Sequence, residues 1–431
     1  MLTEDMKKLL QGCAFDKTFG YVYCADNNGV ALQQERYVAA VNSFEALFGQ
    51  GREAELFSAP GRTEIGGNHT DHQHGCVLAA AVNLDVIAVA SKNSDNTIRI
   101  KSEGYDMDVV SLDKLAPEEG EKNKAAALIR GVAARFAQLG YEVGGFDAYT
   151  TSSVLKGSGL SSSAAFEVLV GTMLNHLFNS GKVAPVQVAQ IGQYAENNFF
   201  GKPCGLMDQT ASAVGGFVTI DFANPVQPVV EKVGFDFAAS GYALCIVNTG
   251  GNHADLTPDY ASVPAEMKAM AAVLNKEYLN DVDETVFYES IGRLRGKISD
   301  RAILRAMHFF ADNARVLLQI DALNSSDFEQ FKQLVLESGR SSYMYLQNVF
   351  SCHNPAEQGV SLALAISERV LAGKGAWRVH GGGFAGTIQA FVPVAELQRY
   401  KQEIEAVMGE GSCFILSIRP VGGVKISPEL Y

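Results

Sequence analysis

The stretch that decides the fold is "KGSGLSSSAAFEVLVGTMLNHLF", residues 156–178. Two glycines lead into three successive serines, and apolar residues with helical periodicity follow from Ala164. The glycines let the backbone approach a ligand closely, and the first turn of a helix presents free N–H groups to an anion. Serine hydroxyls at this point can also bind Mg²⁺. The segment predicts a phosphate-binding loop, although one serine alone would indicate only a helix N-cap.

Two better-known nucleotide motifs do not fit the sequence. The loop lacks the Gly-Lys-[Ser/Thr] ending of a Walker A motif. A second glycine-rich segment, "GGGFAG" at residues 381–386, matches G-x-G-x-x-G, but predicted strands flank it on both sides, whereas a dinucleotide loop opens a helix. The HRD and DFG motifs of protein kinases are missing from the sequence. This second segment is therefore either a tight hairpin or a place where the backbone approaches a ligand.

Two acidic residues, Glu196 and Asp208, flank the turn "FFGKPCGLM" at residues 199–207. Solvated loop charges are the commoner fate of such residues. Asp208, however, has apolar and small neighbours on both sides, and a carboxylate in such surroundings needs a partner or a function. Arg62, in the segment "APGR", is the candidate partner.

The segment "GGNHTDHQHG", residues 66–75, holds three of the eight histidines of the chain together with Asp71. On an irregular loop these side chains lack the i, i+4 spacing of a helical zinc motif, and they mix hard and soft ligands. Asn, His and Asp side chains also supply the donors and acceptors that a ring of sugar hydroxyls requires. A sugar or another polyol is the preferred interpretation, and a metal site is the alternative.

Composition limits the classes of partner. The chain has 431 residues, which favours two domains, and a net charge of −13 that argues against nucleic-acid and anionic membrane surfaces. The N-terminus has no signal-peptide pattern, and the longest apolar segment, residues 77–90, is too short to span a bilayer. The seven cysteines are scattered without CxxC spacing and are expected to be reduced thiols of a cytoplasmic protein. The sequence does not indicate the number of subunits, and a monomer is compatible with it.

Strands and helices alternate in both halves of the chain, which predicts an α/β or α+β fold. The turn-rich residues 221–241 predict the domain boundary. The expected strands are 55–58, 77–90, 97–101, 145–151, 216–221, 242–247, 377–379, 387–392 and 414–418. The expected helices are 34–48, 122–139, 164–178, 185–199, 263–278, 284–294, 300–323, 326–338, 355–372 and 395–408.

Four segments in the same order resemble the galactokinases of the GHMP kinase superfamily. Residues 59–71 resemble the signature PGRVNLIGEHTDY, and residues 157–165 resemble the ATP loop of the superfamily. Residues 195–209 are similar to the segment AEHxFxGxPCGIMDQ, and residues 380–386 to the third superfamily motif, GxGFGG. The resemblance runs from about residue 35 to about residue 418.

The resemblance implies an α+β, two-domain GHMP kinase fold. It comprises a mixed-sheet N-terminal domain like domain 2 of ribosomal protein S5 and a helix-rich, ferredoxin-like C-terminal domain, with the active site in the cleft between them. The expected limits are an extension at residues 1–35, an N-terminal domain at 36–230 and a C-terminal domain at 231–431.

The resemblance also implies an activity: transfer of the γ-phosphoryl group of ATP, with Mg²⁺, to the anomeric C1 hydroxyl of galactose or a close relative. Asp208 matches the proposed catalytic base, and Arg62 matches the arginine that attends both this aspartate and the phosphoryl group. The residues expected to bind the sugar are Asn68, His69, Asp71, His72, Gly205 and Tyr260. Those expected to bind ATP are Lys156, Gly157, Ser158, Gly159, Leu160, Ser161, Ser162, Ser163 and Ala164, and Ser162 or a neighbouring serine with Glu196 is expected to bind Mg²⁺.

The sugar signature departs from the family pattern. The family glutamate before His69, which holds the 6-hydroxyl of the sugar, is Asn68, and the preceding Asn-Leu-Ile is Glu64-Ile65-Gly66. The tyrosine after Asp71 is His72. Exchanging a charged acceptor for an amide changes which sugar groups can be satisfied. The alternatives are therefore a kinase for another hexose, a pentose or an amino sugar such as N-acetylgalactosamine, and a catalytically silent sugar sensor.

Overall fold

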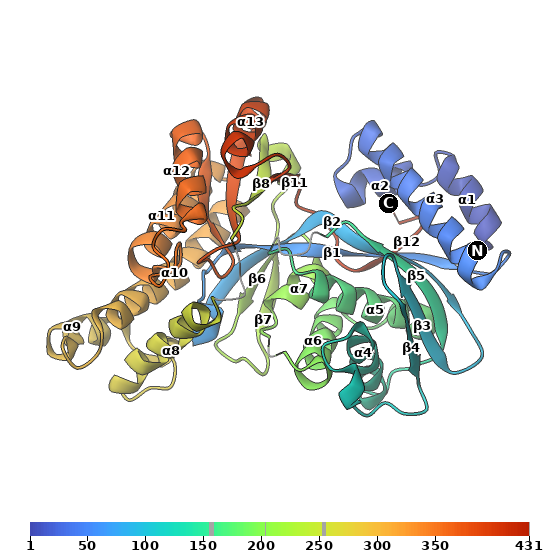
Figure 1. Ribbon diagram of the computed structural model, residues 1–431, viewed down its shortest axis with the longest axis horizontal. Helices are drawn as coiled ribbons and strands as arrows, with labels where there is room; N and C mark the ends of the chain where they lie inside the picture. The colour runs from blue at the N-terminus through green and yellow to red at the C-terminus, as the bar shows by residue number, and fades with distance from the viewer. Residues whose placement is uncertain (155–158, 203, 252–255, 431) are drawn as a thin grey trace.

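The computed structural model describes residues 1–154, 159–202, 204–251 and 256–430. Its two longest strands, β1 (Glu55–Gly66) and β2 (Cys76–Lys92), pair antiparallel and cross the middle of the molecule (Figure 1). Helices lie on both sides of these strands at one end, and the helix-rich C-terminal half lies at the other end. The described part of the chain has no helix that is long and apolar enough to cross a membrane.

The larger sheet has eight strands in the order β12-β1-β2-β5-β3-β4, with β6 paired to β2 and β7 to β6. Among the described strands of this sheet, only β3 and β5 pair in parallel, so the sheet is mixed, as the sequence resemblance implied. Its remaining strands are β3 (Thr97–Ser102), β4 (Met107–Ser111), β5 (Phe146–Ser152), β6 (Phe217–Asp221), β7 (Val229–Val233) and β12 (Val424–Ile426).

Helices cover both faces of this sheet. Successive residues of β2 belong to different cores: Ala88 and Ala90 pack on one face, whereas Ile87 and Val89 pack on the other. A strand buried on both faces needs apolar residues at every position, which explains the nearly continuous apolar run of β2. Four helices cover the first face: α4 (Ala125–Gln138), α5 (Ser162–Asn179), α6 (Pro185–Ala195) and α7 (Met207–Val214). Of the candidate site residues, α5 carries Ser162, Ser163 and Ala164, and α7 carries Asp208.

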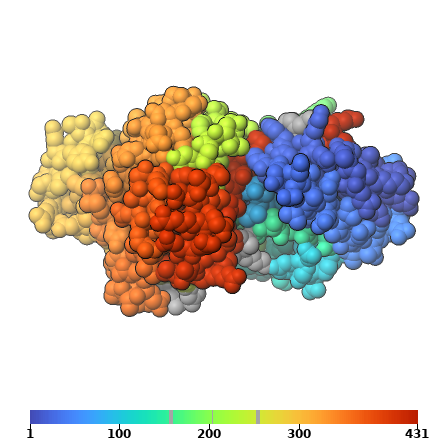
Figure 2. All heavy atoms as spheres, turned by 90° about the horizontal axis from the view of Figure 1, so that it is seen from above, coloured from blue at the N-terminus to red at the C-terminus, as the bar shows by residue number. Residues whose placement is uncertain are grey.

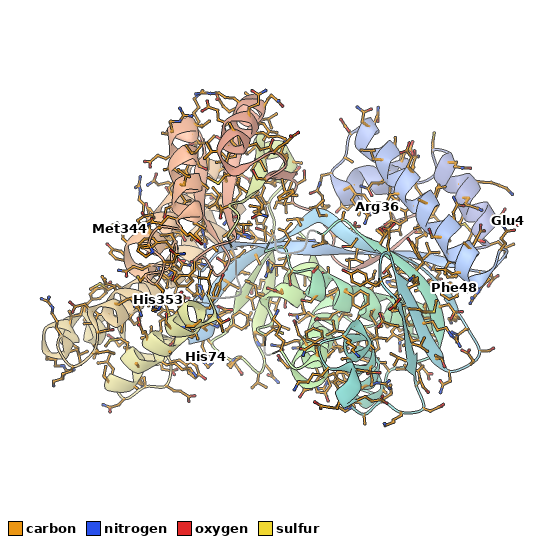
Figure 3. The ribbon with its side chains drawn as sticks, viewed as in Figure 1. Glu4, Arg36, Phe48, His74, Met344 and His353 are labelled. Atoms are coloured by element: carbon orange, nitrogen blue, oxygen red, sulfur yellow. The ribbon has the colours of Figure 1, made fainter. Side chains whose placement is uncertain are left out.

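Three N-terminal helices cover the second face: α1 (Thr3–Gln11), α2 (Asp16–Tyr23) and α3 (Asn27–Phe48). They form the block at one end of the molecule in Figure 2. An ionic contact at Asp85 of β2 ties them to the sheet. Arg36, which Figure 3 labels on α3, lies 2.5 Å from this buried carboxylate. Tyr23 donates a hydrogen bond to the same carboxylate at 2.6 Å, and Arg419 pairs with it at 3.1 Å.

The C-terminal half is built on a four-stranded antiparallel sheet in the order β11-β8-β10-β9. Its strands are β8 (Tyr242–Asn248), β9 (Ala376–His380), β10 (Thr387–Pro393) and β11 (Cys413–Leu416). The helices of this half are α8 (Thr257–Val273), α9 (Glu284–Leu294), α10 (Asp300–Asn324), α11 (Phe328–Ser341), α12 (Gly359–Leu371) and α13 (Leu397–Met408). β9 and β10 form a hairpin, so residues 381–386 are the turn between two strands, one of the two alternatives that the sequence left open.

Several elements differ from the sequence prediction. β1 continues to Gly66 where the sequence predicted a strand that ended at residue 58, because pairing with β2 carries it through the glycine-rich segment. The short elements β4, β7, β12 and α7 were missed, and so were α1 and α2. α7 has no side-chain N-cap and a small-residue sequence, and its burial against β1 and α5 stabilises it in place of local signals.

Candidate active site

The sugar-signature segment forms the tight connection between β1 and β2. Its turn depends on Gly67, which has a φ of +84°, and a Cβ at this position would lie 2.5 Å from the carbonyl oxygen of Cys76. His69 also has a positive φ, +63°. A short 3-10 turn, Asp71–Gln73, then leads into β2. The local backbone therefore places the consecutive side chains of residues 68–72 in different directions.

Arg62 and Asp208 form a bidentate ion pair, as the sequence predicted for these partners. Arg62 Nε and Nη2 each donate to one carboxylate oxygen of Asp208 at 2.6 Å. The two side chains remain 13% and 29% exposed, so a ligand can reach the pair. Burial alone would raise the pKa of Asp208, but the charge and hydrogen bonds of Arg62, with a hydrogen bond from Ser161, lower it. Asp208 is therefore a carboxylate at neutral pH.

The described part of the expected ATP loop lies against this pair. Arg62 donates from Nη1 to the carbonyl of Gly159, and its backbone N–H donates to the carbonyl of Leu160 at 3.0 Å. Gly159 has a φ of +73°, and a Cβ there would lie 3.2 Å from the ring of His380. Ser162, Ser163 and Ala164 form the first turn of α5. Lys156, Gly157 and Ser158 lie outside the described residues.

A cluster of acidic groups lies next to the start of α5. Ser163 donates to Glu196 Oε1 at 3.5 Å, and Gln209 Nε2 donates to Glu196 Oε2 at 2.9 Å and to Glu167 Oε2 at 3.0 Å. Burial and the neighbouring charge of Glu196 raise the pKa of Glu167 well above its usual range. Its Oε1 is buried without a hydrogen-bond partner among the described residues. Hydroxyl and carboxylate oxygens are the donor set that Mg²⁺ prefers, so these residues fit that ion.

The sequence interpretation missed Glu167 and Gln209. Glu167 interrupts an apolar helical run, "AAFEVLV" at residues 164–170. The reasoning that singled out Asp208, an acid among apolar neighbours, could also have identified this residue.

The residues expected to bind the sugar fall into two groups. Asn68, His69 and Tyr260 point toward the 381–386 turn and donate to the carbonyls of Gly381, Gly382 and Gly383, respectively. Asp71, His72 and Gly205 instead border a cavity of about 340 Å³. Asp71 lies beside Gly205, because a Cβ on that glycine would be 3.5 Å from its carboxylate.

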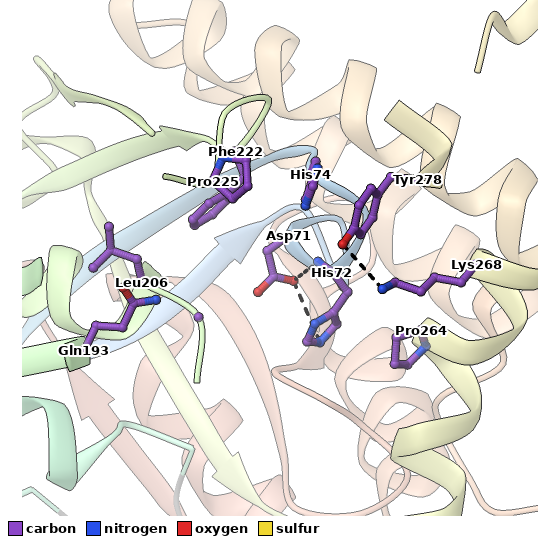
Figure 4. A pocket seen from close by; sticks show the side chains of 11 residues that line it. Asp71, His72, His74, Gln193, Leu206, Phe222, Pro225, Pro264, Lys268 and Tyr278 are labelled. Atoms are coloured by element: carbon purple, nitrogen blue, oxygen red, sulfur yellow. Dashed lines mark hydrogen bonds and ion pairs between the residues drawn. The ribbon is translucent and has the colours of Figure 1, made fainter. Parts of the chain in front are cut away.

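His74, which the sequence left without a role, also lines this cavity (Figure 4). Its ring stacks on Tyr278 with centroids 3.6 Å apart, and Lys268 Nζ lies 4.6 Å from the centroid of that tyrosine. His74 is therefore part of an aromatic wall. Among the residues that the structure describes, no group of three or more His, Cys, Asp or Glu side chains is arranged to hold a metal ion.

His69 is neutral and has a defined tautomer. Burial, together with the neighbouring His72, lowers its pKa to about 4. Its Nε2 lies 3.0 Å from the Gly382 carbonyl, which can only accept, so Nε2 carries the proton. The other ring nitrogen, Nδ1, is then a hydrogen-bond acceptor.

Comparison with known proteins supports the family resemblance that the four sequence motifs indicated. The family model described as "GHMP kinases N terminal domain" matches residues 127–216, and the "Galactokinase galactose-binding signature" matches residues 42–92. The chain is 30% identical over 365 residues to a galactokinase of Streptomyces coelicolor, and the match covers 84% of this chain and 90% of the relative.

Solved structures give the same picture. The crystal structure of Lactococcus lactis galactokinase complexed with galactose matches with a TM-score of 0.74 and 25% identity, over 89% of this chain and 98% of that one. Phosphomevalonate kinase of Streptococcus pneumoniae matches with a TM-score of 0.55 and 12% identity, over 86% of this chain and 99% of that one. The second match shows a shared fold.

Proposed function

The chain belongs to the galactokinase family of GHMP kinases and is an ATP-dependent sugar kinase, and we propose that it phosphorylates the anomeric hydroxyl of galactose or a close relative. The observation that carries this proposal is the Arg62–Asp208 pair, which contacts Gly159 of the ATP loop and remains partly exposed. The family relationship and the galactose-binding signature support galactose as the acceptor. The product would be the sugar 1-phosphate.

In this proposal, Asp208 accepts a hydrogen bond from the C1 hydroxyl and takes its proton as the O–P bond forms. Its low pKa keeps it ionised and ready to accept, although it also makes the carboxylate a weak base. A loose phosphoryl transition state develops little negative charge on the acceptor oxygen, so strong basicity is not required. Arg62 fixes the carboxylate through two hydrogen bonds and places positive charge beside the transferring group.

The other roles follow the family resemblance and are part of the proposal. Residues 156–164 would wrap the phosphates of ATP, with the N-terminus of α5 directed at them. Glu196 and Ser162 would hold Mg²⁺, and Ser163 and Gln209 would orient the glutamate. The bound ion would neutralise phosphate charge. His69 Nδ1 and the Asp71 carboxylate would accept hydrogen bonds from sugar hydroxyls, and His72, Gly205 and Tyr260 would complete the pocket, with Asn68 buried behind it.

We further propose that the substrates bind between an N-terminal domain that ends near residue 230 and a C-terminal domain that begins at 231, with residues 1–35 as an extension. Helix α3 runs across position 35, so the extension and the domain share one helix. We propose that the protein acts in the cytoplasm; the number of its subunits is open, and a monomer is compatible with the sequence. No disulfide joins any of the seven cysteines, which agrees with a reducing compartment.

A kinase for a different hexose, a pentose or an amino sugar is the second candidate, favoured by Asn68 and His72 at signature positions. A silent sensor is disfavoured, because the Arg62–Asp208 pair is assembled and contacts Gly159, in the described part of the ATP loop. The test is release of ADP from ATP and Mg²⁺ over a panel of hexoses, pentoses and amino sugars. Galactose should give the highest kcat/KM. A clear preference for another sugar would replace the acceptor, and no turnover with any sugar would favour the sensor.

A further inference from the structure

Three successive carbonyls of the 381–386 turn are bound by side chains from distant parts of the chain. Asn68 Nδ2 donates to the Gly381 carbonyl at 2.7 Å, His69 Nε2 to Gly382 at 3.0 Å, and Tyr260 OH to Gly383 at 2.8 Å. Such a turn has few backbone partners of its own, because β9 and β10 stop pairing at His380 and Thr387. Other groups also hold the turn, since Asn348 Nδ2 donates to the Gly382 carbonyl at 3.2 Å and the backbone N–H of Thr249 donates to the Gly386 carbonyl at 2.8 Å. The donors to its first three carbonyls nevertheless include three side chains that were expected to bind the sugar.

Asn68 uses all of its hydrogen-bonding groups within the protein. Its other Nδ2 proton goes to Glu64 Oε1 at 3.0 Å, and its Oδ1 accepts from Ser342 at 3.2 Å and from Asn348 at 2.8 Å. Its backbone N–H donates to Asp312 at 2.8 Å, and its carbonyl faces His308 Nε2 at 2.9 Å. The residue is 0% exposed. A side chain in this state has no donor or acceptor left for a ligand.

Glu64 explains why an amide can occupy position 68. Its carboxylate accepts from Asn68 and pairs with Arg378 at 2.7 Å, and both charged side chains are buried. The carboxyl group therefore lies at position 64, next to a cation, although burial raises its pKa to about 7. Position 68 must donate to the Gly381 carbonyl, which an amide can do and a carboxylate cannot.

We propose that Asn68 is a positioning residue: it binds the Gly381 carbonyl, holds the 381–386 turn in place for His69 and Tyr260, and does not contact the sugar. The expected change in KM for the sugar rests on the proposed function, whereas the role of Asn68 in holding the turn does not. Without this bond the turn moves. The carbonyls of Gly382 and Gly383 move with it, and the His69 imidazole and the Tyr260 hydroxyl, which donate to them, lose their orientation. Sugar binding should weaken, whereas ATP binding should not.

The test compares Asn68→Asp and Asn68→Ala with Ser342→Ala. The first two remove the donor to Gly381, with and without an added charge, so that one remains informative if the other fails to fold. Ser342→Ala is the matched control, because it removes a partner of the same amide but leaves the bond to the turn. We expect at least a tenfold higher KM for the sugar in the Asn68 variants, with less than a twofold change in KM for ATP. In Ser342→Ala, KM for the sugar and KM for ATP should both change less than twofold.

Hydrogen exchange measures the turn directly and does not depend on activity. The amides of residues 381–386 should exchange at least tenfold faster in the Asn68 variants than in wild type and in Ser342→Ala. Unchanged exchange in the turn with an unchanged sugar KM would overturn the proposal. So would a KM effect that disappears with a sugar analogue lacking one hydroxyl, since that would show direct contact. If wild type phosphorylated no sugar, the proposed function would fail, and the exchange comparison would still test this inference.

Discussion

Arg62 and Asp208, 146 positions apart in the chain, meet through two parallel hydrogen bonds of 2.6 Å. A bidentate guanidinium–carboxylate pair has a fixed geometry as well as a fixed charge. The pair joins β1 to the first turn of α7, and Arg62 also binds the carbonyl of Gly159. One arginine therefore sets the position of the proposed base relative to the ATP loop.

The first prediction concerns Asp208. Asp208→Asn keeps the shape of the side chain but removes its negative charge, so kcat should fall by about 10²–10⁴-fold, the usual contribution of a general base. Sugar and ATP binding, measured by calorimetry, should change much less. A variant that folds like wild type and keeps a tenth or more of the wild-type kcat would show that the assigned role is wrong.

The second prediction separates the metal ligands from their neighbours. Glu196→Gln and Ser162→Ala should each raise the half-saturating Mg²⁺ concentration about tenfold or more, because each removes a proposed ligand. Ser163→Ala should have a smaller effect, since this hydroxyl contacts Glu196 at 3.5 Å and only orients it. Binding of Mn²⁺ with a non-hydrolysable ATP analogue, followed by electron paramagnetic resonance, gives a readout apart from turnover. A wild-type affinity for Mn²⁺ in all three variants would exclude this metal site.

The third prediction concerns pH and His380, whose ring is hydrogen bonded to Thr63 and Thr387. Burial, helped by the charges of Arg62 and Arg378, lowers the pKa of His380 to about 3. Between about pH 3 and pH 6.5 the unfolded chain therefore binds more protons than the folded one, and stability is lost as the pH falls. At about 1.4 kcal/mol per pH unit, this histidine should account for about 2 kcal/mol between pH 6.5 and pH 5.

Urea unfolding of wild type and His380→Gln at these two pH values measures this contribution. The variant should be less stable at pH 6.5 but should lose about 2 kcal/mol less on acidification. His353→Gln serves as the control, because the side chain of His353 is 82% exposed. An identical pH dependence in His380→Gln and wild type would rule out a neutral, buried His380.

The fourth prediction concerns the N-terminal helices. Phe19 is 0% exposed and stacks on Tyr37 at 5.0 Å, within the core between α1–α3 and the sheet. Phe19→Ala should lower the free energy of unfolding by about 3–5 kcal/mol. Leu32→Ala, at a 64% exposed position of α3, should change it by less than about 0.5 kcal/mol. The kcat of folded Phe19→Ala should match wild type, and a large fall in kcat would instead connect these helices to catalysis.

Long elements with strong local patterns could be predicted from the sequence. Strand β2 and helix α5 were predicted to within a few residues, because apolar periodicity and glycine signals agree there. The helices of residues 1–23 were missed, since their apolar residues serve a core completed by Leu56 and Val89 far along the chain. Tertiary contacts, which stabilise such elements, leave little trace in a local pattern.

The candidate site shows the same division. The pairing of Arg62 with Asp208 was predicted from an acid in apolar surroundings, and the structure confirms the contact. The surroundings of Asn68 could not be predicted, because its partners Ser342, Asn348 and Gly381 lie more than 270 positions away. The signature resemblance placed this residue at the sugar, whereas the structure surrounds it with protein groups.

The most direct test of the central claim is ³¹P NMR of a reaction containing the protein, ATP, Mg²⁺ and galactose. We expect ADP and a new phosphate resonance coupled to the anomeric proton, in equal amounts, with both formed at least about a hundredfold more slowly by Asp208→Asn. A phosphate on another carbon, or the absence of any sugar phosphate from galactose and from every other sugar of the panel, would contradict the assignment of this chain as a sugar 1-kinase.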